Sequence, residues 1–223
     1  FQAVVLYAGK AGWADFHQCF LQLISEFNAC SVFPFTLSPH ILEVDLLSGG
    51  SRLELVEPGF RAHLLSTCCS PSSVVVAVPA YRSFSRRRHL DIQGPRALRD
   101  KSWPRGKTGL TPLEQLCVDN ENLIADFLIE VLGAVADSSP VLFACPEDLG
   151  RTARGWPASL WQWRSMASCL SPPLVRGAIH QCDWADVFFM APTGIITNCK
   201  DLVMNENVHR GWPSFDDAGK YLG

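Results

Sequence analysis

Apolar residues near the start of this chain change from one spacing to another. A short apolar run covers residues 3–7 and is followed by a glycine-containing turn at 8–12. After that turn, apolar residues return at three- and four-residue steps, at Trp13, Phe16, Phe20, Leu23, Ile24 and Phe27. The short run predicts a strand, and the later spacing predicts an amphipathic helix. The chain therefore opens with the strand, turn and helix of a βαβ unit.

Further apolar runs continue this alternation. They predict strands at 30–35, 41–47 (ending near Asp45), 74–78, 141–145, 178–182 and 194–197, and helices at 60–67, 112–133 and 160–170. The helix from 112 has the clearest start, because Thr111 suits the N-cap and Pro112 the first helical position. Residues 79–111 follow neither spacing and are predicted to be irregular.

Strands that alternate with helices predict an α/β fold with an open, mainly parallel sheet flanked by helices. The runs at 74–78 and 141–145 are continuously apolar, as expected of strands buried on both faces. Because no internal repeat is visible, we expect one domain over 1–223 with an irregular insertion at about 79–111. The chain begins and ends within predicted structure, so we also expect it to be part of a longer polypeptide.

Charge is distributed unevenly along the chain. The formal net charge is −3, but residues 82–107, called the basic tract below, hold nine basic and two acidic residues, so the tract carries +7 and the rest −10. Its basic residues are Arg82, Arg86, Arg87, Arg88, Arg96, Arg99, Lys101, Arg105 and Lys107. Such a tract predicts either a localised contact with a polyanion or a solvated loop that pairs with the acidic body.

Composition narrows the class of protein. Hydrophobic residues make up 48% of the chain, which excludes a disordered tail. The nine cysteines form no CxxC pair and no zinc-type cluster with histidine, so we expect reduced thiols, an intracellular compartment and no metal site. The longest apolar runs are far shorter than the ~20 residues of a membrane span, so none is expected.

The turn after the first predicted strand is a candidate ligand site. Gly9 and Gly12 allow a ligand to approach the backbone at the start of a helix, where amide groups are exposed. Many α/β proteins turn in this way without binding anything, so both alternatives stay open on this feature alone.

The order of motifs along nearly the whole chain resembles the cytosine C5 DNA methyltransferases, and most of all the divergent methylase-like domains of protist retroelements. Residues 6–12 resemble the Phe-Ala-Gly-x-Gly-Gly loop of that family, and 78–85 stand where it has Pro-Pro-Cys-Ser-x-Phe/Trp-Ser. Similar segments are 44–46, 94–99, 103–104, 109–110, 120–122, 146–150, 157–161, 180–183 and 211–223. The resemblance implies a Rossmann-like class I S-adenosylmethionine-dependent methyltransferase fold, with Tyr7, Gly9, Gly12 and Asp45 at the cofactor.

The chain departs from the family at the positions that carry its chemistry. C5 methylation needs a thiolate, and Tyr81 stands at that position, where its phenol is a much weaker nucleophile. Ala144, Cys145 and Pro146 match the triplet that begins with the family's glutamate, and residues 190–194 replace Arg-Lys-Pro-Thr-Arg by Met-Ala-Pro-Thr-Gly. Nucleophile, acid and cations are therefore lost together, and we expect no catalytic residue and no bound cofactor.

Other residues are candidates to replace the lost groups. Cys145 is the better placed thiol, since Cys68 and Cys69 precede their strand, but no base is evident beside it. Glu147 and Asp148 are candidate carboxylates or residues at a helix start. His89 is expected to make a polar contact within the loop, and His180 to be structural or functional. Tryptophans 156, 161 and 163 suit either packing or a partner interface.

Two functions remain open on the sequence. The first is an inactive methyltransferase-like module that binds RNA or DNA through the basic tract and belongs to a larger protein or ribonucleoprotein assembly. Cations neutralise phosphates, and Tyr81, Phe84 and Trp103 supply aromatic rings for stacking on bases. The second is an active S-adenosylmethionine-dependent methyltransferase that modifies a base without an enzyme thiolate.

Overall fold

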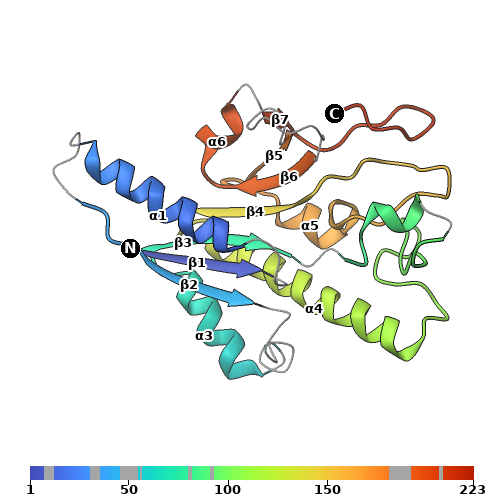
Figure 1. Cartoon of the computed structure of the whole chain (residues 1–223), viewed down its shortest axis with the longest axis horizontal. Helices are drawn as coiled ribbons and strands as arrows, with labels where there is room; N and C mark the ends of the chain where they lie inside the picture. Colours follow the sequence, from blue (N-terminus) through green and yellow to red (C-terminus); the bar gives the residue numbers. More distant parts are fainter. Residues whose placement is uncertain are drawn as a thin grey trace.

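The computed structural model describes residues 1–7, 13–30, 36–45, 55, 57–79, 82–90, 93–180, 192–205 and 208–223. Its centre is a seven-stranded sheet with the order β2-β1-β3-β4-β6-β5-β7 (Figure 1). The strands are β1 (Gln2–Tyr7), β2 (His40–Asp45), β3 (Ser73–Val78), β4 (Val141–Pro146), β5 (Val175–His180), β6 (Pro192–Thr197) and β7 (Val208–Arg210).

Five of the seven strands run in one direction. β1 pairs in parallel with β2 and β3, and β3 pairs in parallel with β4. β6 is antiparallel to both β4 and β5, so β5 has the direction of the first four strands, and β7 runs against it. The predicted α/β class with a mainly parallel sheet is therefore confirmed, and the sheet is compatible with a Rossmann-like fold.

Helices cover both faces of the sheet. They are α1 (Trp13–Ala29), α3 (Pro58–Cys68), α4 (Pro112–Val135), α5 (Arg164–Cys169) and α6 (Lys200–Met204), with short 3₁₀ turns η1 (Arg86–His89) and η2 (Leu160–Gln162). Figure 1 shows α3, α4 and α5 on one face and α1 on the other. None of the described helices is long and apolar enough to cross a bilayer.

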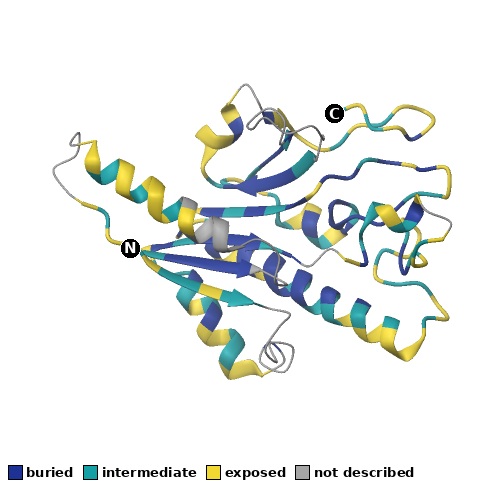
Figure 2. Ribbon diagram, in the orientation of Figure 1, coloured by how far each residue is buried: buried dark blue, intermediate teal, exposed yellow. Residues whose placement is uncertain are grey.

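The main core lies between the sheet and α4. Phe127, Leu128, Val131 and Leu132 of this helix are fully buried, and Figure 2 shows the central strands buried with them. The predicted start of α4 is confirmed by two reciprocal hydrogen bonds. The Thr111 hydroxyl accepts from the backbone N–H of Glu114, and the Glu114 carboxylate accepts from the backbone N–H of Thr111. Such a reciprocal cap stabilises the helix by about 1 kcal/mol.

Several predicted boundaries differ from the structure. The helix expected at 160–170 is split into η2 and α5, because Trp163 between them has extended backbone (φ −77°, ψ 132°). The predicted strand at 178–182 begins earlier, at Val175. Of the strand expected at 30–35, Cys30 lies in the turn after α1 and the rest lies outside the described residues.

Candidate functional site

Two candidate cofactor residues end neighbouring strands. Tyr7 and Asp45 are partners in the register of β1 and β2, so they lie side by side at the carboxyl edge of the sheet. Ligands of open α/β sheets bind beyond this edge. Gly9 and Gly12 lie outside the described residues, as does the side chain of Tyr7. The part of this site that the structure describes is therefore a pair of adjacent strand ends.

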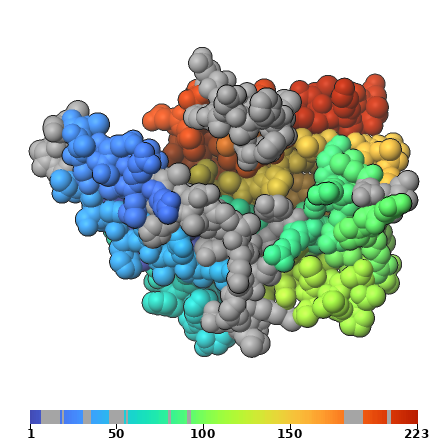
Figure 3. Space-filling view, in the orientation of Figure 1, coloured from blue at the N-terminus to red at the C-terminus, as the bar shows by residue number. Residues whose placement is uncertain are grey.

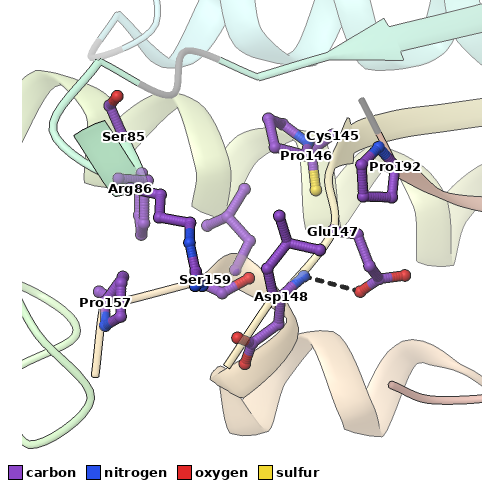
Figure 4. A pocket seen from close by; sticks show the side chains of 13 residues that line it. Ser85, Arg86, Cys145, Pro146, Glu147, Asp148, Pro157, Ser159 and Pro192 are labelled. Carbon is purple, nitrogen blue, oxygen red and sulfur yellow. Dashed lines mark hydrogen bonds between the residues drawn. The ribbon is translucent and has the colours of Figure 1, made fainter. Parts of the chain in front are cut away.

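A cavity of about 250 Å³ lies at the same edge of the sheet, beside β4 (Figure 4). The loop after β3 forms one wall, the end of β4 a second, and the segment before η2 a third. Its lining residues are Phe84, Ser85, Arg86, Cys145, Pro146, Glu147, Asp148, Leu149, Pro157, Ala158, Ser159, Leu160 and Pro192. Most of the lining is apolar, so the chemistry of the cavity depends on its few polar groups.

Cys145 is the thiol of this cavity, and it is held protonated. The side chain is 3% exposed, and burial raises the pKa of the thiol well above its ordinary value. The negative charge of Glu147 acts in the same direction. Because the thiolate is the nucleophilic form, Cys145 is a poor attacking group at neutral pH.

The other two positions matched to the methyltransferase chemistry do not contribute to the described cavity wall. Alternation along β4 directs Ala144 to the opposite face from Cys145, where it packs against a small cluster around Ile195 and Val203. Tyr81 lies outside the described residues. The sequence comparison treats Ala144 and Cys145 as one degenerate motif, whereas the structure separates them across the sheet.

Glu147 is occupied by a buried ion pair. Both of its carboxylate oxygens accept hydrogen bonds from Nη2 of Arg176, at 2.6 and 2.5 Å, and each side chain is at most 1% exposed. The guanidinium lies 4.2 Å from the ring centre of Trp161 and 5.1 Å from that of Trp212. Burial raises the pKa of Glu147, and the adjacent Arg176 opposes that rise. Figure 4 shows this carboxylate turned away from Arg86.

Trp161 also excludes a side chain from β6. Gly194 is aligned with the last arginine of the family motif, and a Cβ atom there would lie 2.4 Å from the Trp161 ring. The indole N–H of Trp161 donates to the Pro146 carbonyl at 2.9 Å, which fixes the ring in this place. The sequence left open whether this tryptophan packs or binds a partner, and the structure shows that it packs.

The remaining polar groups of the cavity hold its loops together. The Asp148 carboxylate accepts from Gln162 Nε2 at 2.7 Å and from the Gly150 backbone N–H at 2.9 Å. Arg86 donates to the carbonyls of Gly150 and Arg151 at 2.7 and 3.3 Å. These bonds join the basic tract to the loop after β4. Arg86, expected to contact nucleic acid, thus has a structural role.

The thiols are expected to differ sharply in their reaction with iodoacetamide. At pH 8 the native protein should be alkylated at exposed Cys30 and Cys199 at least tenfold faster than at Cys145, because only a thiolate reacts and burial keeps Cys145 protonated. Peptide mass spectrometry over a time course measures each site, and the protein unfolded in guanidinium serves as the control. Equal rates at Cys145 and Cys199 in the native state would contradict the assignment of Cys145 as inert.

Much of the basic tract is paired within the molecule. Arg96 pairs with Glu114, Arg105 with Asp126 at 2.6 Å, and Lys107 with Asp100 at 3.0 Å. Glu114 and Asp126 belong to α4, so these pairs attach the tract to the helix that carries the core. For Arg96 and Arg105 the structure supports the alternative of a loop paired with the acidic body, whereas Lys107 pairs within the tract.

Arg99 corrects one expectation. It is fully buried, pairs with Glu121 at 3.5 Å and donates to the Ser83 hydroxyl at 2.6 Å. Its guanidinium lies 3.9 Å from the ring centre of Phe84, and burial lowers its pKa to about 10. The prediction that Arg99 contacts nucleic acid is wrong for this structure, because its donors are used inside the protein.

The other cations of the tract remain near solvent. Lys101 lies 3.5 Å from the ring centre of Trp156 and is exposed. Arg82 and Arg87 are also exposed, and within the described part of the chain neither guanidinium has a hydrogen-bond or ion-pair partner. Figure 3 shows the tract, in green, forming part of the molecular surface. Arg82 and Arg87 are therefore accessible to an external anion.

His89 makes the polar contact expected of it. The ring is buried, and its Nε2 lies 3.2 Å from the Arg99 carbonyl. Burial lowers the pKa of this imidazole, which is therefore neutral at pH 7. His180 is buried as well, with its ring 5.0 Å from that of His209.

Neither a metal-type cluster nor a similar known protein identifies the site. Within the described ranges, no three or more histidine, cysteine, aspartate or glutamate residues come together in a way that could hold a metal ion. Comparisons of the chain with protein-family models, with curated proteins and with solved structures found no match in any of the three.

Proposed function

We propose that this chain is a methyltransferase-like module that has lost C5 methyl transfer and binds nucleic acid through the exposed cations of the basic tract. One contrast carries the proposal. At the cavity Cys145 is protonated and Glu147 is paired with Arg176, whereas Arg82 and Arg87 stand exposed at the surface. The module's place in a larger protein or ribonucleoprotein assembly rests on the loss of catalytic groups alone.

An exposed aromatic ring of the same tract also suits nucleotide bases. The side chain of Trp103 is an exposed indole within the tract. The Asp100 carboxylate accepts from the backbone N–H groups of Ser102 and Trp103, at 2.9 and 3.0 Å, and so holds the turn that presents the ring. An aromatic ring next to cations is the combination that binds single strands, because bases stack while phosphates are neutralised. We therefore expect single strands to bind more tightly than duplexes.

Fluorescence anisotropy with labelled 20-nucleotide DNA and RNA tests the proposal. The double variant Arg82→Gln/Arg87→Gln is expected to bind about tenfold more weakly than the native chain, as two exposed contacts worth roughly 0.7 kcal/mol each would give. Lys200→Gln/Arg210→Gln is the matched control, since it removes two exposed cations from α6 and β7. Equal losses in both double variants, or no binding by the native chain, would contradict the proposal.

A second function is favoured by the adjacency of Tyr7 and Asp45. In an active S-adenosylmethionine-dependent methyltransferase these two strand ends would hold the cofactor together with Gly9 and Gly12. Ala11 stands where the resembling loop has a glycine, so its methyl group is expected to crowd the cofactor. Titration with labelled S-adenosylmethionine separates the two functions: micromolar binding supports this one, and no binding at millimolar cofactor excludes it.

A further inference from the structure

A second cleft opens within the basic tract, and its described lining is almost wholly cationic. It has a volume of about 320 Å³ and is lined by Arg88, His89, Arg96, Ala97, Lys107 and Arg154. Its described lining residues differ from those of the cavity beside β4. Arg154 comes from the loop after β4, outside the tract, so the fold adds a cation that the local sequence does not contain. Among the described residues that line the cleft there is no carboxylate.

Three cations of this cleft, Arg88, Arg96 and Lys107, are held in place by ion pairs and hydrogen bonds. Glu114 pairs with Arg96, and Asp100 pairs with Lys107 at 3.0 Å. Arg88 donates from Nε to the Arg82 carbonyl at 3.1 Å and from Nη1 to the Arg96 carbonyl at 2.9 Å. Arg88, Arg96 and Lys107 are thereby fixed, and each keeps further N–H donors for a ligand. Groups fixed in advance lose less conformational freedom when they bind.

The imidazole of His89 also lines the cleft. Burial lowers its pKa, and the nearby charges of Lys107 and Arg154 lower it further. The Arg99 carbonyl and the Asp100 carboxylate act in the opposite direction without reversing the shift. Positive charge from two segments, the basic tract and the loop after β4, therefore acts on the same ring.

We propose that this cleft binds the phosphate monoester at the end of a nucleic acid strand. The inference rests on the proposed function, which supplies the nucleic acid, and goes beyond it by assigning a distinct group to a distinct place. A phosphodiester carries one negative charge, whereas a monoester carries about −1.5 to −2 at pH 7 and offers three acceptor oxygens. Arginine donates to such a group through paired N–H bonds. Four cations that line one cleft match the charge of the monoester better than that of a single backbone phosphate.

Oligonucleotides that differ only at their ends test the inference on the full chain. Labelled 12-nucleotide strands with a 5′-phosphate, with a 3′-phosphate and with hydroxyl groups at both ends are titrated by anisotropy. At least one phosphorylated strand is expected to bind about tenfold more tightly than the hydroxyl strand. Arg154→Gln and Lys107→Gln should each abolish that preference and leave the affinity for the hydroxyl strand within about twofold. Arg82→Gln/Arg87→Gln should weaken all three strands and preserve the preference.

The outcomes separate this inference from the proposed function. Equal binding of phosphorylated and hydroxyl strands overturns the inference and leaves the proposed function standing. No binding of any strand overturns both. Inorganic phosphate or a phosphoserine peptide that competes as well as the phosphorylated strand assigns the cleft to another ligand and overturns the inference. A preference that survives in both Arg154→Gln and Lys107→Gln shows that the monoester binds elsewhere, and this result also overturns the inference.

Discussion

Replacing Arg99 with alanine should lower the free energy of unfolding by about 3–5 kcal/mol, because it leaves the buried carboxylate of Glu121 without its cation. Arg99 also donates to the Asn122 side chain at 2.7 Å and to the Pro104 carbonyl at 3.0 Å, so its loss strands several polar groups at once. Unfolding in urea, followed by tryptophan fluorescence, measures the change.

The control for Arg99 is Arg96→Ala, in the same tract. Arg96 pairs with Glu114, but its side chain is 54% exposed, and exposed ion pairs contribute at most about 1 kcal/mol. A loss for Arg99→Ala no larger than that for Arg96→Ala would show that Arg99 is not the buried anchor of the tract. The comparison therefore decides whether the tract is part of the fold or a loosely attached loop.

The second large effect is expected at the ion pair beside the cavity. Arg176→Met should lower the free energy of unfolding by about 3–5 kcal/mol, since Glu147 then remains buried and unpaired. The double variant Arg176→Met/Glu147→Gln should recover part of this loss, because it removes the stranded charge while methionine still fills the space against Trp161. Thermal and urea unfolding of Arg176→Met, Glu147→Gln and the double variant measure the loss and the recovery.

Recovery in the double variant is the informative comparison at this pair. If the double variant is less stable than Arg176→Met alone, the pair is not the reason for the loss, and the contacts of each side chain act independently. If it is more stable, Glu147 serves the fold two residues after Cys145, which is the role assigned to it here.

The order of strands and helices was predictable because it depends on local signals. The buried strands β3 and β4 are continuous apolar runs, and α4 begins with a cap, a proline and an acid. These signals act over a few residues, so they can be seen in the sequence. The short elements α6 and β7 were not predicted, since five and three residues carry too little periodicity.

Pairing over longer distances was not predictable from a charge count. The tract carries +7, but its partners Glu114, Glu121 and Asp126 lie on α4, which a count of residues 82–107 omits. One signal was present: Glu121 lies between Val118 and Ile124, three residues away on each side, on the apolar face of the helix. A lone carboxylate there indicates a buried cationic partner. Arg176 within the apolar run of β5 is a similar case.

The candidate site shows what alternation along a strand adds to motif matching. Aligned as letters, Ala144 and Cys145 belong to one degenerate triplet. In β4 these two residues face opposite sides of the sheet, and of the two only Cys145 lines the cavity. To the nucleophile and glutamate missing from the sequence, the structure thus adds a Cys145 thiol that is kept protonated and a Glu147 carboxylate that is paired with Arg176.

The dependence of oligonucleotide binding on salt tests most directly whether this chain binds nucleic acid through its surface cations. For a 20-nucleotide single strand, the logarithm of the association constant should fall linearly with that of the salt concentration, with a slope of about −0.7 for each phosphate contacted. Arg82→Gln/Arg87→Gln should make that slope shallower by about 1 to 2, and Lys200→Gln/Arg210→Gln should leave it unchanged. Binding that is indifferent to salt, or a slope equal in all three proteins, would contradict the role given to the basic tract.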